Sequence, residues 1–208
     1  MLARCGIACG LIALAACGSS LGKAPGGSAA ASCGPARAKT LAVDQTARVY
    51  ESGGNVYGCS TASRRSYRLG ASARSIREGR AGPIALAGTD VAYGYTVYGV
   101  DTVSAQVRVR DLATGKQLRS EPATTAPARV EFRESVDSVV VRSDGAVAWI
   151  GESGSVISGP TTTEVDRADA RGLAKVDSGS GIDVHSLRLH GATVTWRHGG
   201  RSRSASLK

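Results

Sequence analysis

The fold is decided by the stretch Val139-Val-Val-Arg-Ser-Asp-Gly-Ala-Val-Ala-Trp-Ile150. Two runs rich in β-branched and other apolar residues flank the tripeptide Ser143-Asp144-Gly145. An Asp-Gly pair is a strong hairpin signal, because both residues tolerate the positive φ angles that a tight turn requires. The stretch therefore predicts two antiparallel strands joined by a short turn.

The same pattern, an apolar strand followed by a polar turn and a Val-x-aromatic sequence, recurs along the chain. Clear copies end in Val91-Ala-Tyr93 and Val194-Thr-Trp196, and a weaker copy surrounds Val56. The anchoring valines, Val56, Val91, Val147 and Val194, are 35, 56 and 47 residues apart. These spacings lie in the range of blade-like repeats with loops of variable length.

The rest of the chain also reads as strands and turns, and no convincing helix of ordinary length follows residue 16. We therefore predict an all-β fold of antiparallel meanders in propeller-like repeats, forming a small or incomplete β-propeller. A connection is expected at 117–135 and a loop at 177–181. Strands are expected at 40–43, 47–50, 56–59, 66–69, 84–87, 91–97, 106–110, 155–157, 161–165, 182–189, 192–197 and 201–207.

One turn supports the propeller interpretation. Asp111-Leu-Ala-Thr-Gly-Lys116 resembles the turn that often closes strands in β-propeller repeats. The last repeat shows only three strands, whereas a propeller blade usually has four. We expect residues 40–43 to pair with this last repeat and close the ring; the alternative is an open fan of sheets.

The N-terminus resembles a bacterial export signal. Residues 1–16 contain Arg4 and then an apolar run too short to span a bilayer. They end in Leu14-Ala-Ala-Cys17, which resembles the lipobox of bacterial lipoproteins. That resemblance implies cleavage by signal peptidase II and a diacylglyceryl group on the Cys17 thiol, with further acylation giving stable anchoring. The alternative is an ordinary secretory signal cut near residues 29–31.

Residues 17–38 are rich in Gly, Ser, Ala and Pro and lack any period, which predicts a flexible tether before a β domain at 39–208. The lipobox resemblance implies that Cys5 and Cys9 leave with the signal peptide and that Cys17 carries the lipid. Cys33 and Cys59 remain, and an even pair in an oxidising compartment predicts a disulfide. Two free thiols are the alternative.

The exported region is similar to uncharacterised actinobacterial lipoproteins with propeller-like repeats, notably over 176–207, and this resemblance brings no known activity. The chain carries 26 Lys and Arg against 17 Asp and Glu, for a net charge of +9. Such a charge favours contact with anionic surfaces, such as phospholipid head groups or envelope polymers, and the alternative is a soluble surface with excess arginine. An incomplete propeller would need a partner to cover its edges, and another envelope protein is the candidate. Because the export signal predicts a location outside the cell, we expect nucleic acid not to be a partner.

Stretches that imitate catalytic motifs lack essential parts. Ser178 lies in a sequence resembling the nucleophile loop of trypsin-like proteases, but all three histidines follow it, whereas the base of that family precedes the serine. Asp183, His185 and His190 are the candidates for a metal site, although such groups are more often solvated. We expect no catalytic residue, cofactor or metal.

These observations predict a membrane-anchored extracytoplasmic lipoprotein that acts as a binding or scaffold module of unknown ligand. One alternative is an envelope hydrolase with an unrecognised carboxylate or metal site. A deep polar pocket holding two carboxylates with perturbed pKa values would favour that alternative. The second alternative is a purely structural envelope component. The absence of any pocket with convergent polar groups would favour this alternative.

Overall fold

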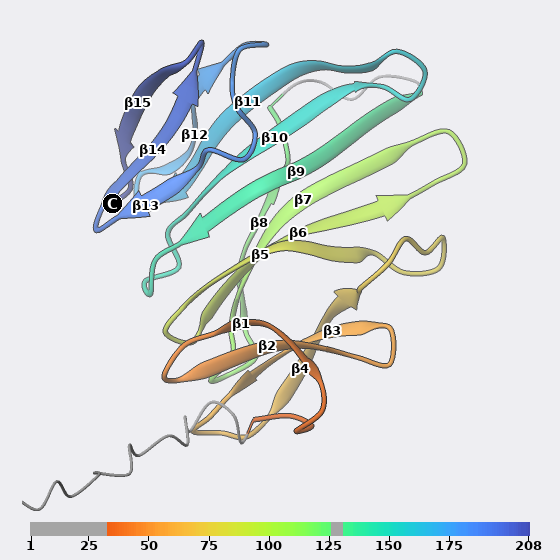
Figure 1. The fold of residues 1–208 in the computed structure, drawn as a ribbon, viewed down its shortest axis with the longest axis vertical. Coiled ribbons are helices and arrows are strands. Elements are labelled where there is room, and N and C mark those ends of the chain that lie inside the picture. Colours follow the sequence, from red (N-terminus) through yellow and green to blue (C-terminus); the bar gives the residue numbers. More distant parts are fainter. Residues whose placement is uncertain (1–32, 126–130) are drawn as a thin grey trace, which may run out of the picture.

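The computed structural model describes residues 33–125 and 131–208, and within them the chain forms fifteen strands and no helix (Figure 1). The predicted all-β fold is confirmed. The expected signal peptide, Cys17 and the tether as far as residue 32 lie outside the described residues. No helix in the described part of the chain is long and apolar enough to cross a membrane.

The strands form four successive antiparallel meanders, of which the first three have four strands and the last has three. The first repeat comprises β1 (Lys39–Val43), β2 (Ala47–Ser52), β3 (Asn55–Ser60) and β4 (Ser66–Ala71). The second comprises β5 (Arg80–Ala87), β6 (Asp90–Tyr98), β7 (Val103–Asp111) and β8 (Gln117–Pro122). The third comprises β9 (Phe132–Val141), β10 (Val147–Ser155), β11 (Gly159–Asp169) and β12 (Gly172–Ser178). The fourth comprises β13 (Arg188–His190), β14 (Thr193–His198) and β15 (Arg201–Ser206).

Neighbouring repeats are joined by very little backbone pairing. A single parallel pair, Ala71 with Arg80, links β4 to β5, and a second, Val103 with Arg133, links β7 to β9. The fourth repeat forms a separate sheet in the order β13-β14-β15. The repeats are therefore held together mainly by the side chains packed between their faces.

The Val-x-aromatic signal marks the side chains that fill these interfaces. Tyr93 is buried between the first and second repeats, Trp149 between the second and third, and Trp196 between the third and fourth. All three are at most 3% exposed. Each repeat after the first thus inserts its aromatic side chain toward the repeat before it, and burying such a side chain removes a large apolar area from water.

The first repeat is a weak copy for a steric reason. Gly58 stands where the other repeats carry the aromatic residue, and a Cβ there would meet the side chain of Leu112 at 2.5 Å. Leu112 comes from the turn that resembles those of propeller repeats, and it is fully buried against the first repeat. At this interface the second repeat supplies the bulky side chain, and the first repeat supplies the space.

The predicted closure of the ring is wrong. The structure pairs β1 with β2, and β15 with β14, so the repeats form an open, propeller-like stack. The last sheet buries Val194 and Trp196 against the third repeat and exposes Thr193 and Arg197 on the other side. Because this outer face is polar, it ends the stack without needing a further repeat to cover it.

Three other expected elements also differ. Of the strand expected at 182–189, only residues 188 and 189 belong to β13, which ends at His190. Residues 183–187 form no strand, and Ile182 makes an isolated bridge to His198 on β14. The connection expected at 117–135 contains β8 and the start of β9, so the second repeat has its fourth strand. The strand expected at 155–157 is the end of β10 and a turn.

The predicted disulfide is confirmed. Cys33 and Cys59 are bonded with their Cα atoms 5.9 Å apart, and both side chains are buried. The bond holds the end of the expected tether against the outer face of the first repeat, beside the stacked rings of Tyr50 and Tyr57. The buried Arg48 guanidinium reinforces this contact by donating hydrogen bonds to the carbonyl oxygens of residues 33, 35 and 38.

Candidate functional site

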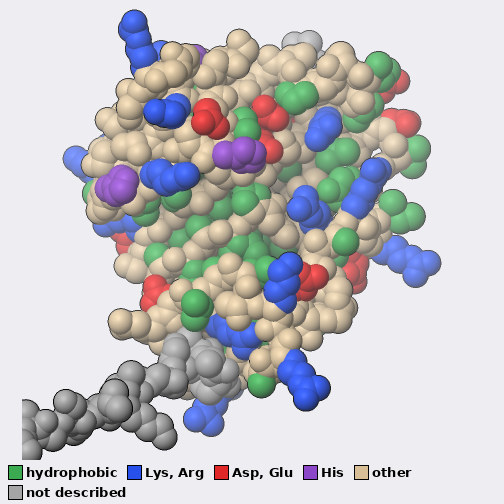
Figure 2. All heavy atoms as spheres, viewed as in Figure 1, with side chains coloured by type: hydrophobic (Ala, Val, Ile, Leu, Met, Phe, Trp, Pro, Cys, Tyr) green, Lys and Arg blue, Asp and Glu red, His purple; other side chains and the backbone are tan. Residues whose placement is uncertain are grey.

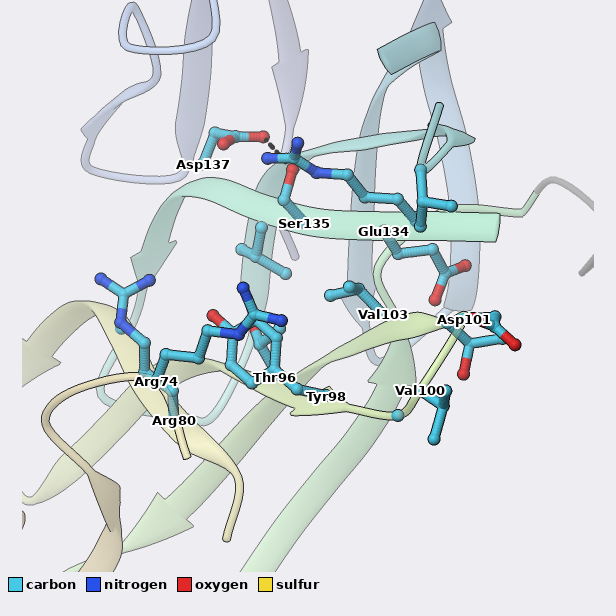
Figure 3. Close-up of a pocket in the computed structure, with 16 residues that line it drawn as sticks. Arg74, Arg80, Thr96, Tyr98, Val100, Asp101, Val103, Glu134, Ser135 and Asp137 are labelled. Carbon is cyan, nitrogen blue, oxygen red and sulfur yellow. Dashed lines mark hydrogen bonds between the residues drawn. The ribbon is translucent and has the colours of Figure 1, made fainter. Parts of the chain in front are cut away.

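A cavity of about 570 Å³ opens where the second and third repeats separate, at the end of the stack that carries the β6–β7 and β10–β11 turns (Figure 3). Its walls come from the loop before β5, the start of β5, the β6–β7 hairpin and the start of β9. Most of the lining is polar, and its charged residues are Arg74, Arg80, Asp101, Arg133, Glu134 and Asp137.

Three arginines, Arg74, Arg80 and Arg133, line this cavity, and none forms an ion pair with a described residue, although the charge of Arg133 acts on the nearby Asp137 and Glu152. Arg80 and Arg133 hold equivalent positions, because each makes the single parallel pair that links its repeat to the one before. The Arg74 guanidinium lies over the ring of Tyr98, 4.8 Å from its centroid. Guanidinium groups carry several donors in a planar fork and suit carboxylates and phosphates. The cavity can therefore bind an anionic group.

Glu134 also lines the cavity, but its oxygens are already engaged. The backbone N–H of Ala105 donates to Oε2 at 3.2 Å, and the Thr124 hydroxyl donates to Oε1 at 3.4 Å. Burial raises the pKa of Glu134, and these two hydrogen bonds offset part of that rise. This carboxylate mainly ties the second repeat to the third.

Asp137 lies on the other side of β9 (Figure 3), where it accepts a hydrogen bond of 3.0 Å from Ser135. Burial raises the pKa of Asp137, while the Ser135 hydrogen bond and the charges of His185 and Arg133 oppose the rise. Burial also raises the pKa of Glu152 on β10, and the negative charge of Asp137 raises it further. Two acidic groups with raised pKa values, Asp137 and Glu152, thus lie near each other beside the cavity.

The expected metal candidates do not come together. Asp183 and His185 line a second, more open hollow with Arg188 and Arg197, and His190 does not line it. Among the residues that the structure describes, His, Cys, Asp and Glu form no group of three or more suited to a metal. Ser178 ends β12 and is exposed.

A separate acidic group, Asp166, is buried in the third repeat. Its register partners are Trp149 on β10 and Lys175 on β12, and neither of its carboxylate oxygens has a hydrogen-bond partner among the described residues. Burial, reinforced by the negative charge of Glu164, raises its pKa to about 7, although Lys175 opposes the rise. Glu164 itself is satisfied by Thr125 and by Lys175.

Sequence reasoning missed the cavity because its residues come from distant parts of the chain. Arg74, Arg80 and Arg133 occur in segments whose sequence indicates loop or connection. One signal was available: Arg80 and Arg133 each lie close to the start of a repeat. An alignment of the repeats on their first strands would have placed both arginines near the first position of that strand.

No protein-family model and no curated protein matches the chain. Among solved structures, the chain is similar to the extracellular domain of a protein described as a putative one-component system of B. thetaiotaomicron, at 11% identity and a TM-score of 0.39. It is also similar to an oligogalacturonate lyase in complex with manganese, at 11% identity and a TM-score of 0.30. The alignments cover 81% and 79% of this chain, but 22% and 62% of those proteins. At such scores neither likeness supports a function, and the functional argument depends on the cavity.

Proposed function

We propose that the chain is a lipid-anchored, extracytoplasmic binding module whose cavity holds an anionic group of an envelope polymer or envelope protein. The observation that carries this proposal is that Arg74, Arg80 and Arg133 line one cavity and form no ion pair with any described residue. Guanidinium donors that line a cavity and are not paired within the protein favour a ligand that supplies the missing negative charge.

The extracytoplasmic part of the proposal has independent support. Disulfides form and persist in oxidising compartments and are rare in the cytoplasm. The Cys33–Cys59 bond therefore indicates that the domain folds outside the cytoplasm. The lipid anchor is supported by the resemblance of residues 14–17 to a lipobox.

We expect the mature N-terminus to be a diacylglyceryl-modified Cys17. Mass spectrometry of the exported protein measures this directly, and an unmodified N-terminus beyond residue 17 would contradict the anchor. Cys17→Ser should release or mislocalise the protein while leaving its thermal unfolding unchanged, because residue 17 precedes the folded domain. Unfolding of the domain by this substitution would show a structural role instead.

We expect Arg133→Gln to weaken binding of an anionic oligomer at least tenfold, because one charge-assisted hydrogen bond contributes about 1.5–3 kcal/mol. Suitable probes are a soluble glycerol-phosphate oligomer and a uronic-acid oligomer, with a neutral glucan as the control ligand, measured by calorimetry at low and moderate salt. Arg65→Gln, in the turn between β3 and β4 at the opposite end, is the matched variant. Equal weakening by both variants would show general charge attraction and not a site.

An envelope hydrolase is the second candidate, because Glu134 and Asp137 both line the cavity and burial raises both pKa values. Against it, the two carboxylates lie on opposite sides of β9, and Glu134 is held by hydrogen bonds from Ala105 and Thr124. Asp137→Asn separates the two functions. A hydrolase would lose turnover of the oligomer, whereas a binding module shows no turnover and keeps its affinity within about threefold, which is a change of less than about 0.7 kcal/mol.

A further inference from the structure

Three turns at the cavity end of the stack carry apolar side chains that are almost fully exposed. Ile76 is 81% exposed in the loop between β4 and β5, Val100 is 98% exposed in the β6–β7 turn, and Ile157 is 80% exposed in the β10–β11 turn. Single exposed apolar residues are normal on protein surfaces. Three of them in turns at one end of the stack indicate a common role.

The strand directions place these tips at one end of the domain. Figure 1 shows the β4–β5, β6–β7 and β10–β11 turns along the same edge of the stack, and Figure 2 shows hydrophobic side chains gathered at that margin among charged ones. The tips therefore place their exposed apolar side chains at one end of the domain. The cavity opens at this same end, since Val100 and Val156 belong to its lining.

The opposite end of the stack is built differently. Its turns consist of residues such as Gly88-Thr89, Ala113-Thr114 and Ser143-Asp144. The exposed apolar residues near that end, Val43, Leu118 and Leu173, lie within strands and are 40–58% exposed. The apolar tips thus distinguish one end of an otherwise repetitive domain.

The apolar tips are surrounded by cationic side chains. Arg74, Arg77, Arg80 and Arg133 are exposed at this end and form no ion pair with any described residue. Two exposed acids, Asp101 and Glu131, lie there as well, so cations exceed unpaired acids. Apolar groups that project beyond a cationic surface match the interface of an anionic bilayer, where acyl chains lie just below a layer of phosphates.

We infer that this end of the domain docks on an anionic phospholipid surface, with Ile76, Val100 and Ile157 entering the interfacial layer and the arginines contacting phosphates. The inference adds a direct contact to the proposed lipid anchor and does not depend on what the cavity binds. Covalent geometry permits it. The chain from Cys17 to Cys33 has sixteen Cα–Cα steps and can span at most about 55 Å, which exceeds the length of these strands. A ligand held in the cavity would then lie at the membrane surface.

A tryptophan introduced at one tip tests the inference in the full exported protein, reconstituted into vesicles. The native Trp149 and Trp196 are buried, so the emission of the introduced residue can be recognised as a difference from the parent protein. We expect Val100→Trp to shift to shorter wavelength and to be quenched by brominated acyl chains in phosphatidylglycerol vesicles. Ala113→Trp is the matched control, because it lies in the turn at the other end of β7.

Adding Arg74→Gln to Val100→Trp should reduce the ratio of docked to undocked domain about fivefold, because one arginine near an anionic surface contributes that factor. Water-like, unquenched emission from Val100→Trp would overturn the inference, and so would equal quenching of Ala113→Trp. A surface that binds a protein partner would also give unquenched emission, because the vesicles contain no other protein. Loss of the anchor is detected separately by the mass of the N-terminus.

Discussion

Replacing Asp166 with asparagine should raise the free energy of unfolding by about 4 kcal/mol above pH 7 and change it little near pH 4. The buried carboxylate has a pKa of about 7 in the folded protein, against an ordinary value of 3.8. Each pKa unit of difference between the folded and unfolded states corresponds to about 1.4 kcal/mol. Ionisation of Asp166 therefore lowers the free energy of unfolding at neutral pH.

The direction of the pH dependence follows from which state holds the proton. Between about pH 4 and pH 7 the folded protein keeps a proton on Asp166 that the unfolded chain has lost, so the free energy of unfolding falls as pH rises through this window. Above pH 7 both states have lost the proton and the contribution is constant. The Asp166→Asn variant would have no such dependence at this position. Asp90, whose pKa is raised to about 6, makes the free energy of unfolding fall with pH in the same way in the parent protein and in the Asp166→Asn variant. Its contribution therefore cancels when the two proteins are compared.

Urea unfolding of the parent and of Asp166→Asn at about pH 4, 5.5, 7 and 8 measures this difference across the window that the linkage argument defines. Asp101→Asn is a suitable control, because Asp101 is exposed in the turn between β6 and β7. Parallel curves for the parent and Asp166→Asn across the whole pH range would contradict the prediction. They would mean that the carboxylate is ionised in the folded protein at no cost, which requires a partner that the described residues do not supply.

Removing the Cys33–Cys59 disulfide is the second change for which we expect a large effect. The bond closes a loop with a sequence separation of 26, and in the chain-entropy model its loss costs about 3.5 kcal/mol. Both cysteines are buried in a cluster with Tyr50, so Cys33→Ala/Cys59→Ala also removes packed atoms. We expect the melting temperature to fall and residues 33–38 to become accessible to protease.

Chemical reduction of the parent protein isolates the cross-link from the packing. Reduction breaks the bond but keeps both sulfur atoms, so a fall in stability equal to that of the double alanine variant assigns the effect to the cross-link. Arg48→Met tests the second attachment, because the guanidinium donates to the carbonyl oxygens of Cys33, Pro35 and Ala38. An unchanged unfolding free energy after complete reduction would contradict the entropic argument, since the loop would then be closed by packing alone.

The sequence by itself determined the local elements of this fold. Asp-Gly and related turns fix hairpins through the φ angles they tolerate, and alternation of valines fixes which face of a strand is buried, so both signals act over a few residues. The Val-x-aromatic sequence correctly indicated the second, third and fourth repeats, and cysteine counting correctly paired Cys33 with Cys59. The role of Gly58, which accepts Leu112 from the next repeat, required both repeats to be in place.

Only the tertiary structure decided how the repeats are arranged and which side chains from different repeats line one cavity. Whether the stack closes depends on the angles between faces, and these are set by the volumes of Tyr93, Trp149 and Trp196 packed against residues from another repeat. The same arrangement gathers Arg80 and Arg133 at one cavity, although 53 residues separate them. Strand signals are local, whereas packing volumes and charge clusters depend on contacts between residues far apart in the chain, and so a single sequence predicted the strands and not the site.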